Sequence, residues 1–189
     1  MKQVNIGNKL ISNENNSYLI AEIGINHNGD LDNVIKLMNN SKEAGFDCVK
    51  FQKRTPELST PDSQKNVMRE TPWGDMTYLE YKKRIELDQE AYSAIDQHSK
   101  KIDIDWTASC WDIPSVDFIA DFNVPFIKIA SASLTDKDLI QKIKNTKKPI
   151  ILSTGMSTMD EIKKAVAVLD KSELILLHTT SSYPCAPEE

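Results

Sequence analysis

Two lysines of this chain lie inside apolar runs, Lys50 in Val-Lys-Phe and Lys128 in Ile-Lys-Ile. A lysine in such a run cannot easily reach water and needs an anion as its partner. Each lysine could pair with a structural carboxylate such as Glu22. Neighbouring hydroxyl groups favour phosphate instead, because phosphate accepts many hydrogen bonds from charged and neutral donors. The side chains of this phosphate hypothesis are Lys50, Lys128, Thr107, Ser131 and Ser153.

The stretch 18–29 carries the second candidate group. It begins as an apolar run that contains the single carboxylate Glu22, and it ends in Asn26, His27, Asn28 and Gly29. Desolvating a charge is costly unless a partner compensates for it, so we expect Glu22 to be buried and paired. A structural ion pair and a functional site both satisfy that requirement. The polar groups at other strand ends favour a site.

Composition excludes several classes of protein. The chain has 189 residues, of which 40% are hydrophobic and 27% charged, as in a soluble globular domain. Its net charge of −5 gives no electrostatic case for nucleic acid or an anionic membrane. No apolar run approaches the roughly 20 residues of a membrane span, and the N-terminus lacks the apolar core of a signal peptide. Three cysteines without metal-type spacing indicate reduced thiols in a cytoplasmic protein.

The elements that must position these groups follow a strand–helix rhythm. A hairpin is expected over 3–12 with its turn at Gly7-Asn8. Residues 53–76 form a long polar excursion, which in a compact domain is usually functional or disordered. We expect strands at 18–24, 48–52, 105–110, 125–130, 149–154 and 174–180, and helices at 31–44, 77–101 with a break near 87–88, 113–122, 135–145 and 158–171.

This rhythm predicts a parallel α/β fold. An open doubly wound sheet and a (β/α)8 barrel both fit, but no Gly-x-Gly-x-x-Gly follows the first long strand, so a dinucleotide fold gains no support. About six of the eight units of a TIM barrel are expected here. The predicted organisation is a hairpin and linker over 1–17 and an incomplete barrel over 18–189.

In such folds the active site lies at the carboxyl ends of the strands. His27 and His178 fall there and fit ligands, acids or satisfied core groups equally well. Cys110 fits a small buried apolar residue better than a nucleophile, because no base stands at a diagnostic spacing. The residues therefore indicate a barrel enzyme that binds a small phosphorylated anion beside a carboxylate, with proton transfer or carbon–carbon bond chemistry as the reaction.

Six ordered motifs are similar to those of the sialic acid synthase family, whose members make N-acetylneuraminate, legionaminic acid or pseudaminic acid. The resemblance runs from about Asn5 to the last residue and includes the helix-like segment 77–87. The motifs are Ala-Glu-Ile-Gly-Ile-Asn-His-Asn-Gly (21–29), Val-Lys-Phe-Gln-Lys-Arg-Thr (49–55), Thr-Ala-Ser (107–109), Lys-Ile-Ala-Ser (128–131), Leu-Ser-Thr-Gly-Met (152–156) and Leu-Leu-His…Tyr-Pro (176–184).

The resemblance implies a condensation of phosphoenolpyruvate with an open-chain N-acetylmannosamine-type sugar. Carbon 3 of phosphoenolpyruvate attacks the aldehyde, water adds at carbon 2, and phosphate leaves by carbon–oxygen cleavage. Glu22 would handle protons near the oxocarbenium-like centre. Lys50, Thr107, Lys128, Ser131 and Ser153 would hold phosphoenolpyruvate, and Gln52 and Tyr183 would face the sugar.

The resemblance also implies a divalent metal, manganese or magnesium, that polarises the aldehyde. The family's two metal-binding histidines lie in later strands, beyond Glu189. An antifreeze-like C-terminal domain, which lends an arginine to the partner subunit of a homodimer, would also lie beyond this chain. Ser133 and Ser181 stand where neuraminate synthases often carry an acidic residue and an asparagine, so these two sugar-binding positions leave the acylated sugar open.

Two further hypotheses remain at this point. Another phosphate-binding barrel enzyme, such as an aldolase, would form a Schiff base on Lys50 or Lys128. Alternatively, the chain is an inactive fragment or a binding module. Six strands of an open barrel would leave strand edges and apolar faces uncovered, so we expect a poorly stable polypeptide or one that is completed by a partner.

Overall fold

The computed structural model describes residues 3–182, 184–186 and 188. The chain forms two compact units, one spanning Ser17–Val124 and the other combining Met1–Asn16 with Pro125–Glu189. Each unit is described below by itself. Tyr183, one of the predicted sugar-binding residues, lies outside the described residues.

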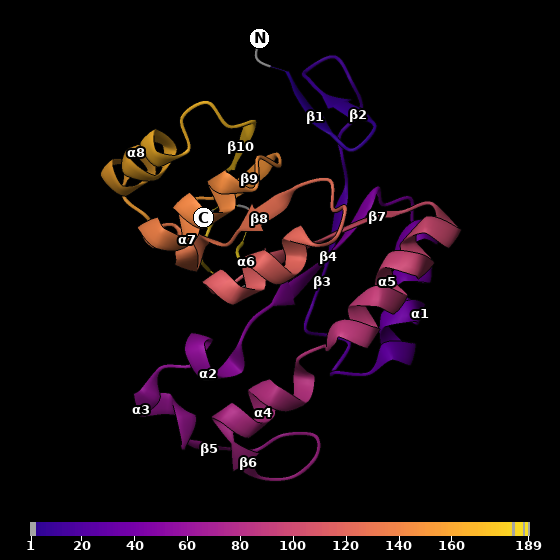
Figure 1. Cartoon of the computed structure of the whole chain (residues 1–189), viewed down its shortest axis with the longest axis vertical. Coiled ribbons are helices and arrows are strands. Elements are labelled where there is room, and N and C mark those ends of the chain that lie inside the picture. Colours follow the sequence, from indigo (N-terminus) through magenta and orange to yellow (C-terminus); the bar gives the residue numbers. More distant parts are fainter. Residues whose placement is uncertain (1–2, 183, 187, 189) are drawn as a thin grey trace. The chain divides into compact units, whose positions relative to one another are not determined.

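The unit Ser17–Val124 is built on three parallel strands, β3 (Ile20–Gly24), β4 (Cys48–Lys53) and β7 (Asp105–Cys110). Strand β4 lies in the middle, so its residues pair on both sides: Lys50 faces Glu22 in β3 and Thr107 in β7. Helices α1 (Leu31–Glu43) and α5 (Gln89–Ile102) pack side by side (Figure 1). The middle strand therefore carries its side chains between two parallel neighbours.

Side-chain caps and an aromatic core explain where these helices begin and how they pack. Asp30 and Asp88 accept hydrogen bonds from the first turns of α1 and α5, as N-cap residues do. Tyr92 of α5 is fully buried, and its ring lies 5.6 Å from that of Trp106 in β7 and 5.2 Å from that of Phe118 in α6 (Ile113–Ala120). Such contacts fix the helices against the sheet.

The polar excursion 53–76 is ordered in part, which the sequence did not predict. It contains the short helices α2 (Pro56–Ser59) and α3 (Asp62–Lys65) and a small hairpin of β5 (Met68–Arg69) and β6 (Met76–Thr77). Helix α4 (Tyr78–Ile85) follows. Elements of two to four residues are too short to leave a hydrophobic period, so they escape a pattern-based prediction.

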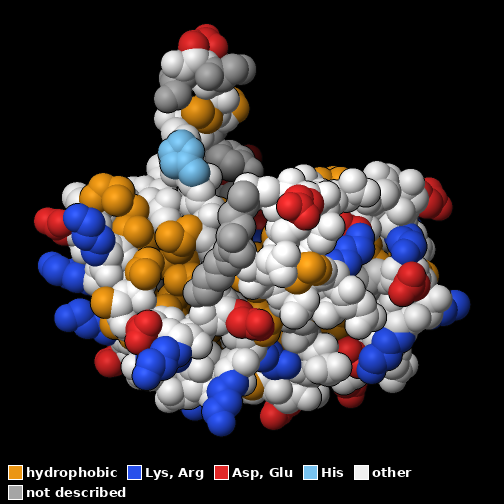
Figure 2. All heavy atoms as spheres, turned by 90° about the horizontal axis from the view of Figure 1, so that it is seen from above, with side chains coloured by type: hydrophobic (Ala, Val, Ile, Leu, Met, Phe, Trp, Pro, Cys, Tyr) orange, Lys and Arg blue, Asp and Glu red, His pale blue; other side chains and the backbone are white. Residues whose placement is uncertain are grey.

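The second unit also contains three parallel strands, β8 (Ile127–Ile129), β9 (Ile150–Ser153) and β10 (Leu174–Leu177), with β9 in the middle. Among the described residues of this unit, β10 pairs with β9 alone. Helices α7 (Lys137–Asn145) and α8 (Met159–Val168), the 3₁₀ turn Ser131–Ser133 and the hairpin of β1 (Val4–Ile6) and β2 (Lys9–Ile11) complete the unit. Figure 2 shows hydrophobic side chains gathered on one side of the face that it draws.

Most predicted elements are confirmed, with shorter ends. The helix expected over 77–101 is interrupted as predicted, since α4 ends at Ile85 and α5 begins at Gln89. The strand expected over 174–180 ends at Leu177, which pairs in register with Ser153, the last residue of β9. The parallel α/β class is confirmed in each unit, and closure into a TIM-type barrel stays a prediction. Within the described part of the chain, no helix is long and apolar enough to cross a membrane.

Candidate functional site

Lys50 is the centre of the polar cluster in the unit Ser17–Val124. Its side chain is only 9% exposed, and its Nζ lies 2.6 Å from Oε2 of Glu22. The same Nζ donates to Oγ of Ser109 at 2.8 Å. The expectation that a lysine in this apolar run would be buried beside an anionic partner is confirmed. The buried ammonium thus already has one carboxylate and one hydroxyl around it.

The expectation that Glu22 would be buried is wrong, since its side chain is 49% exposed. Among the described residues β3 pairs with β4 alone, and its pairing register shifts between Glu22 and Gly24. This irregular strand end lets the carboxylate reach both Lys50 and solvent. The carboxylate thus pairs with a buried ammonium while about half of its side chain faces solvent.

Gly24 and Gln52 complete the opening beside this ion pair. A Cβ atom at Gly24 would lie 3.2 Å from Oε1 of Glu22 and 3.4 Å from Nε2 of Gln52. The carboxylate and the amide therefore converge on the space that this glycine leaves free. The main chain of Gln52 is fixed as well, because its carbonyl accepts a hydrogen bond of 3.0 Å from the Tyr92 hydroxyl.

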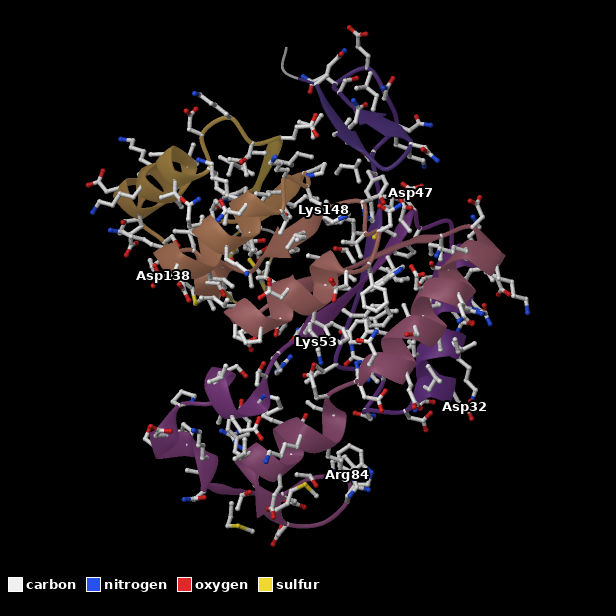
Figure 3. All side chains as sticks on the ribbon, in the orientation of Figure 1. Asp32, Asp47, Lys53, Arg84, Asp138 and Lys148 are labelled. Atoms are coloured by element: carbon white, nitrogen blue, oxygen red, sulfur yellow. The ribbon has the colours of Figure 1, made fainter. Side chains whose placement is uncertain are left out.

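A second set of charged groups lies at the end of β4, and two of them, Arg54 and Glu86, were not singled out from the sequence. Glu86, which follows α4, accepts from Nζ of Lys53 at 2.8 Å and from the main-chain N–H of Arg54 at 3.1 Å. Burial raises the pKa of the Glu86 carboxyl, against the lowering effect of Lys53 and Arg54. In Figure 3, Lys53 lies where β4 leads toward α2. One sequence feature could have predicted that Arg54 belongs to the site. Arg54 stands two residues after Gln52, so in an extended chain both side chains lie on the same side.

His27 is a satisfied core group in this structure. It is 2% exposed, and its Nδ1 accepts a hydrogen bond of 2.9 Å from the main-chain N–H of Gly29. Burial, and to a lesser extent the charge of Arg54, lowers the pKa of His27 to about 4. The imidazole is therefore neutral near pH 7 and fixes the loop between β3 and α1.

Thr107 and Cys110 of β7 are both fully buried. Thr107 pairs in register with Lys50, so both side chains lie on the same side of the sheet. Burial raises the pKa of the Cys110 thiol to about 12, which disfavours the thiolate that a nucleophile needs. The interpretation of Cys110 as a buried apolar residue rather than a nucleophile is supported.

The second unit holds the other predicted phosphate-binding residues. Lys128 of β8 is 7% exposed, and its Nζ donates to the carbonyl of Ile129 at 3.0 Å. Ser153 is also buried, at the carboxyl end of β9, where it pairs in register with Leu177 of β10. Lys128 is therefore a second buried ammonium, and the sequence predicted its burial correctly.

Gly155 brings two predicted hydroxyl groups together in this unit. Its N–H donates to Oγ of Ser131 at 3.0 Å, and a Cβ atom at this position would lie 2.9 Å from Oγ of Ser181. The missing side chain thus makes room for both serines. Ser133 lies in the same 3₁₀ turn as Ser131 and is buried, whereas His178 is exposed.

The predicted site residues thus form two groups, one in each unit. Glu22, Lys50, Gln52 and Thr107 belong to the first unit; Lys128, Ser131, Ser133, Ser153 and Ser181 belong to the second. Their binding roles stay predictions. Among the residues that the structure describes, no group of three or more His, Cys, Asp or Glu side chains could hold a metal ion. The divalent metal that the resemblance implies therefore stays a prediction.

Comparison with known families decides the assignment, because residues 37–189 match the NeuB family model. The chain belongs to the NeuB family. It is 37% identical over 177 residues to the N-acetylneuraminate-9-phosphate synthase of Drosophila melanogaster, an alignment that covers 91% of this chain and 47% of that protein. It is 36% identical over 173 residues to the N,N'-diacetyllegionaminic acid synthase of Campylobacter jejuni, covering 88% of this chain and 52% of that protein.

A solved structure agrees with this assignment. The N-acetylneuraminic acid synthetase of Leptospira borgpetersenii, in complex with citrate, superposes with a TM-score of 0.88 at 26% identity and covers 99% of this chain and 62% of that chain. The resemblance to sialic acid synthases is thereby confirmed. The NeuB chain described here spans about half the length of the curated relatives that it matches.

Proposed function

We propose that this NeuB chain supplies the phosphoenolpyruvate-binding residues and the catalytic carboxylate of a nonulosonate synthase. The substrates would be phosphoenolpyruvate and an open-chain N-acylated aminosugar, and the products a nonulosonic acid and inorganic phosphate. The single observation that carries this proposal is the buried Lys50 ammonium, 2.6 Å from Glu22 and 2.8 Å from Ser109 Oγ. It places a fixed positive charge beside a carboxylate that solvent can reach.

The proposed reaction uses these two charges differently. Carbon 3 of phosphoenolpyruvate bonds to the aldehyde carbon of the sugar, the enol double bond supplies the electron pair, and the aldehyde oxygen takes up a proton to become a hydroxyl group. Carbon 2 becomes electron-deficient and takes up water. Its bond to the phosphate oxygen then breaks, the ketone forms, and the second proton of the water leaves with the phosphate. Lys50 would hold the anionic substrate, and Glu22 would accept the proton that the added water loses. Lys128, Thr107, Ser131 and Ser153 would contribute further donors to phosphoenolpyruvate.

The identities of the aminosugar and of the metal ion are the next part of the proposal. Gln52, Ser133, Ser181 and Tyr183 are the proposed sugar-binding residues, and the printed names of the relatives offer neuraminate, legionaminate and pseudaminate chemistry. A divalent metal, manganese or magnesium, stays a prediction. No step above passes through it, because the described residues offer no cluster of metal ligands.

An aldolase-type reaction is the second candidate. Its Schiff base would form on Lys50 or Lys128, and the Nζ of Lys50 is already held in an ion pair with Glu22. Borohydride reduction in the presence of substrate separates the two mechanisms. A stable adduct on Lys50 or Lys128, located by mass spectrometry, would establish the aldolase.

Phosphate release from phosphoenolpyruvate tests the proposed function. We would measure it with manganese and either N-acetylmannosamine or its 6-phosphate, on this chain and on the full reading frame of its gene. Release by the longer product supports the synthase, and weaker release in Lys50→Gln assigns the activity to this site. Binding of phosphoenolpyruvate without release indicates a different sugar. Absence of both binding and release in the longer product overturns the proposal.

A further inference from the structure

The side-chain amide of Gln52 has one orientation that chemistry imposes. Its Oε1 accepts a hydrogen bond from Nη2 of Arg54. A guanidinium group carries only N–H donors, so the amide oxygen must face Arg54 and the NH₂ group must face the other way. The nitrogen of that NH₂ group, Nε2, lies 3.4 Å from the position that a Cβ atom would take at Gly24.

Arg54 is itself held firmly enough to impose this orientation. The residue is 3% exposed, and its Nε lies 3.5 Å from Oε2 of Glu86. Its main-chain N–H donates to the other oxygen of the same carboxylate at 3.1 Å. The guanidinium carbon also lies 5.4 Å from the centre of the Trp111 ring. The guanidinium is therefore buried between the Glu86 carboxylate, the Trp111 ring and the Gln52 amide.

The result is a donor beside an acceptor at the opening next to Gly24. The Gln52 NH₂ group and the Glu22 carboxylate converge there, and neither can exchange its role with the other. A hydroxyl group suits such a pair, because it can accept from the amide and donate to the carboxylate at once. An amide turned the other way would place two acceptors side by side and repel the lone pairs of a sugar hydroxyl.

We propose that Arg54 is a positioning residue that turns the Gln52 amide so that its NH₂ group binds a hydroxyl or acyl oxygen of the open-chain aminosugar. The inference rests on the proposed function and deepens it by naming how the sugar side of the site is set. Arg54 does not touch the sugar; it acts through Gln52. Its loss therefore weakens binding of the sugar and leaves binding of phosphoenolpyruvate unchanged.

A structural role for Arg54 predicts a different result. Arg54 could serve only to balance the Glu86 charge, in which case its loss would disturb the whole site. Glu86 keeps a partner in the variant, however, because Lys53 lies 2.8 Å from its Oε1. Arg54→Met retains the apolar volume of the side chain and removes every donor, and Arg54→Lys restores a donor. Arg84→Met is the matched control, since Arg84 is exposed on α4.

The experiment is a double-mutant cycle on the full reading frame, with steady-state KM and kcat for both substrates. We expect Arg54→Met to raise the KM for the aminosugar about 10-fold, the value of one net hydrogen bond. The KM for phosphoenolpyruvate and kcat should change less than about twofold. Arg54→Lys should recover part of the loss, and Arg84→Met should match the unchanged protein. In the Gln52→Ala background, Arg54→Met should have almost no further effect.

The other outcomes contradict either the role of Arg54 or the proposed function. Multiplicative effects of Arg54→Met and Gln52→Ala on the aminosugar KM show that Arg54 does not act through Gln52. Equal losses for both substrates assign Arg54 a structural role. Both results leave the synthase itself standing, because the unchanged protein still releases phosphate. If the unchanged protein releases none with any aminosugar, the proposed function fails and the sugar-binding role of Gln52 fails with it.

Discussion

At the scale of single residues, the two buried lysines explain why sequence could locate the candidate site. A charged side chain inside an apolar run is rare, because its desolvation is costly without a partner. Lys50 has such a partner in Glu22. The structural ion pair and the functional site, which the sequence left as alternatives, are compatible, since the carboxylate remains half exposed while it holds the lysine.

Lys50→Gln tests the charge at this position. The substitution keeps a hydrogen-bond donor and removes the ammonium, so the KM for phosphoenolpyruvate should rise roughly 10- to 100-fold, as charge-assisted hydrogen bonds predict. Steady-state kinetics on the full reading frame measure it. Lys36→Gln, on the exposed side of α1, is the control and should change nothing. An unchanged KM in Lys50→Gln would remove this lysine from the phosphoenolpyruvate site.

His27 predicts a pH dependence of stability. Its folded-state pKa of about 4 lies below the ordinary 6.5, so the unfolded chain binds the proton more readily. The stability that neutral His27 contributes is complete above pH 6.5 and is lost as the pH falls toward 4. Between pH 7 and pH 5 the loss is on the order of 1–2 kcal/mol.

His27→Asn is the matched variant, because the Asn Oδ1 can replace Nδ1 as acceptor for the Gly29 N–H and does not titrate. The drop in unfolding free energy between pH 7 and pH 5, measured by urea titration, should be smaller in His27→Asn than in the unchanged protein. Equal drops in the two proteins would show that His27 is not the titrating group.

Sequence reasoning found the residues that break a local pattern and missed those that support them. Lys50 and Glu22 are visible because they interrupt apolar runs. Arg54 and Glu86 stand in polar stretches, where a charged residue is unremarkable, and their pairing joins segments 32 residues apart. Long-range pairs of this kind are set by the tertiary structure and leave no local pattern to detect.

At the scale of elements, the loop between β3 and α1 depends on a close backbone contact with α4. Gly29 has φ +74°, and a Cβ atom there would lie 2.3 Å from the main-chain oxygen of Arg84. Main-chain atoms cannot move aside as a flexible side chain can. The Asn-His-Asn-Gly motif is thus partly a packing motif, in which the glycine lets the loop that carries His27 lie against α4.

Gly29→Ala should therefore destabilise the protein strongly. Added strain from the positive φ and from the clash should cost about 3 kcal/mol or more. Gly45 offers a matched control, since its φ is +84° and a Cβ there would meet nothing within 4 Å. Gly45→Ala should cost only about 1–2 kcal/mol, the strain alone. Equal losses in urea unfolding of the two variants would contradict the close contact with α4.

Helices and strands were predicted correctly where the segment was long enough to show a hydrophobic period. Strand β7 was predicted with its observed bounds, and the break between α4 and α5 was placed correctly. The capping box at Thr77 and Glu80 explains why α4 begins where it does. The 3₁₀ turn Ser131–Ser133 was not predicted, because three residues of a turn carry no period.

At the scale of the whole molecule, sequence established the parallel α/β class and the order of its elements. Whether six strands belong to a closed barrel depends on contacts between distant segments, which no local pattern encodes. The chain spans about half the length of the curated relatives that it matches.

Strand β10 carries the last prediction. Among the described residues it pairs only with β9, and Leu176 and Leu177 are 47% and 36% exposed. An apolar strand with a free edge is a template for pairing with another chain. We therefore expect this polypeptide alone to associate as its concentration rises, or to melt without a cooperative transition. Light scattering after size-exclusion chromatography and thermal unfolding measure the two behaviours.

A charge at this edge should suppress the association, because pairing would then desolvate it. Leu176→Lys should lower the apparent mass at high concentration, whereas Leu58→Lys should not, since Leu58 is 64% exposed and belongs to helix α2 and not to a strand. Equal effects of both variants would assign the association to general apolar exposure rather than to β10. A clean monomer with a sharp thermal transition would show that β10 is stable as an edge strand, and the expectation of completion by a partner would then be wrong.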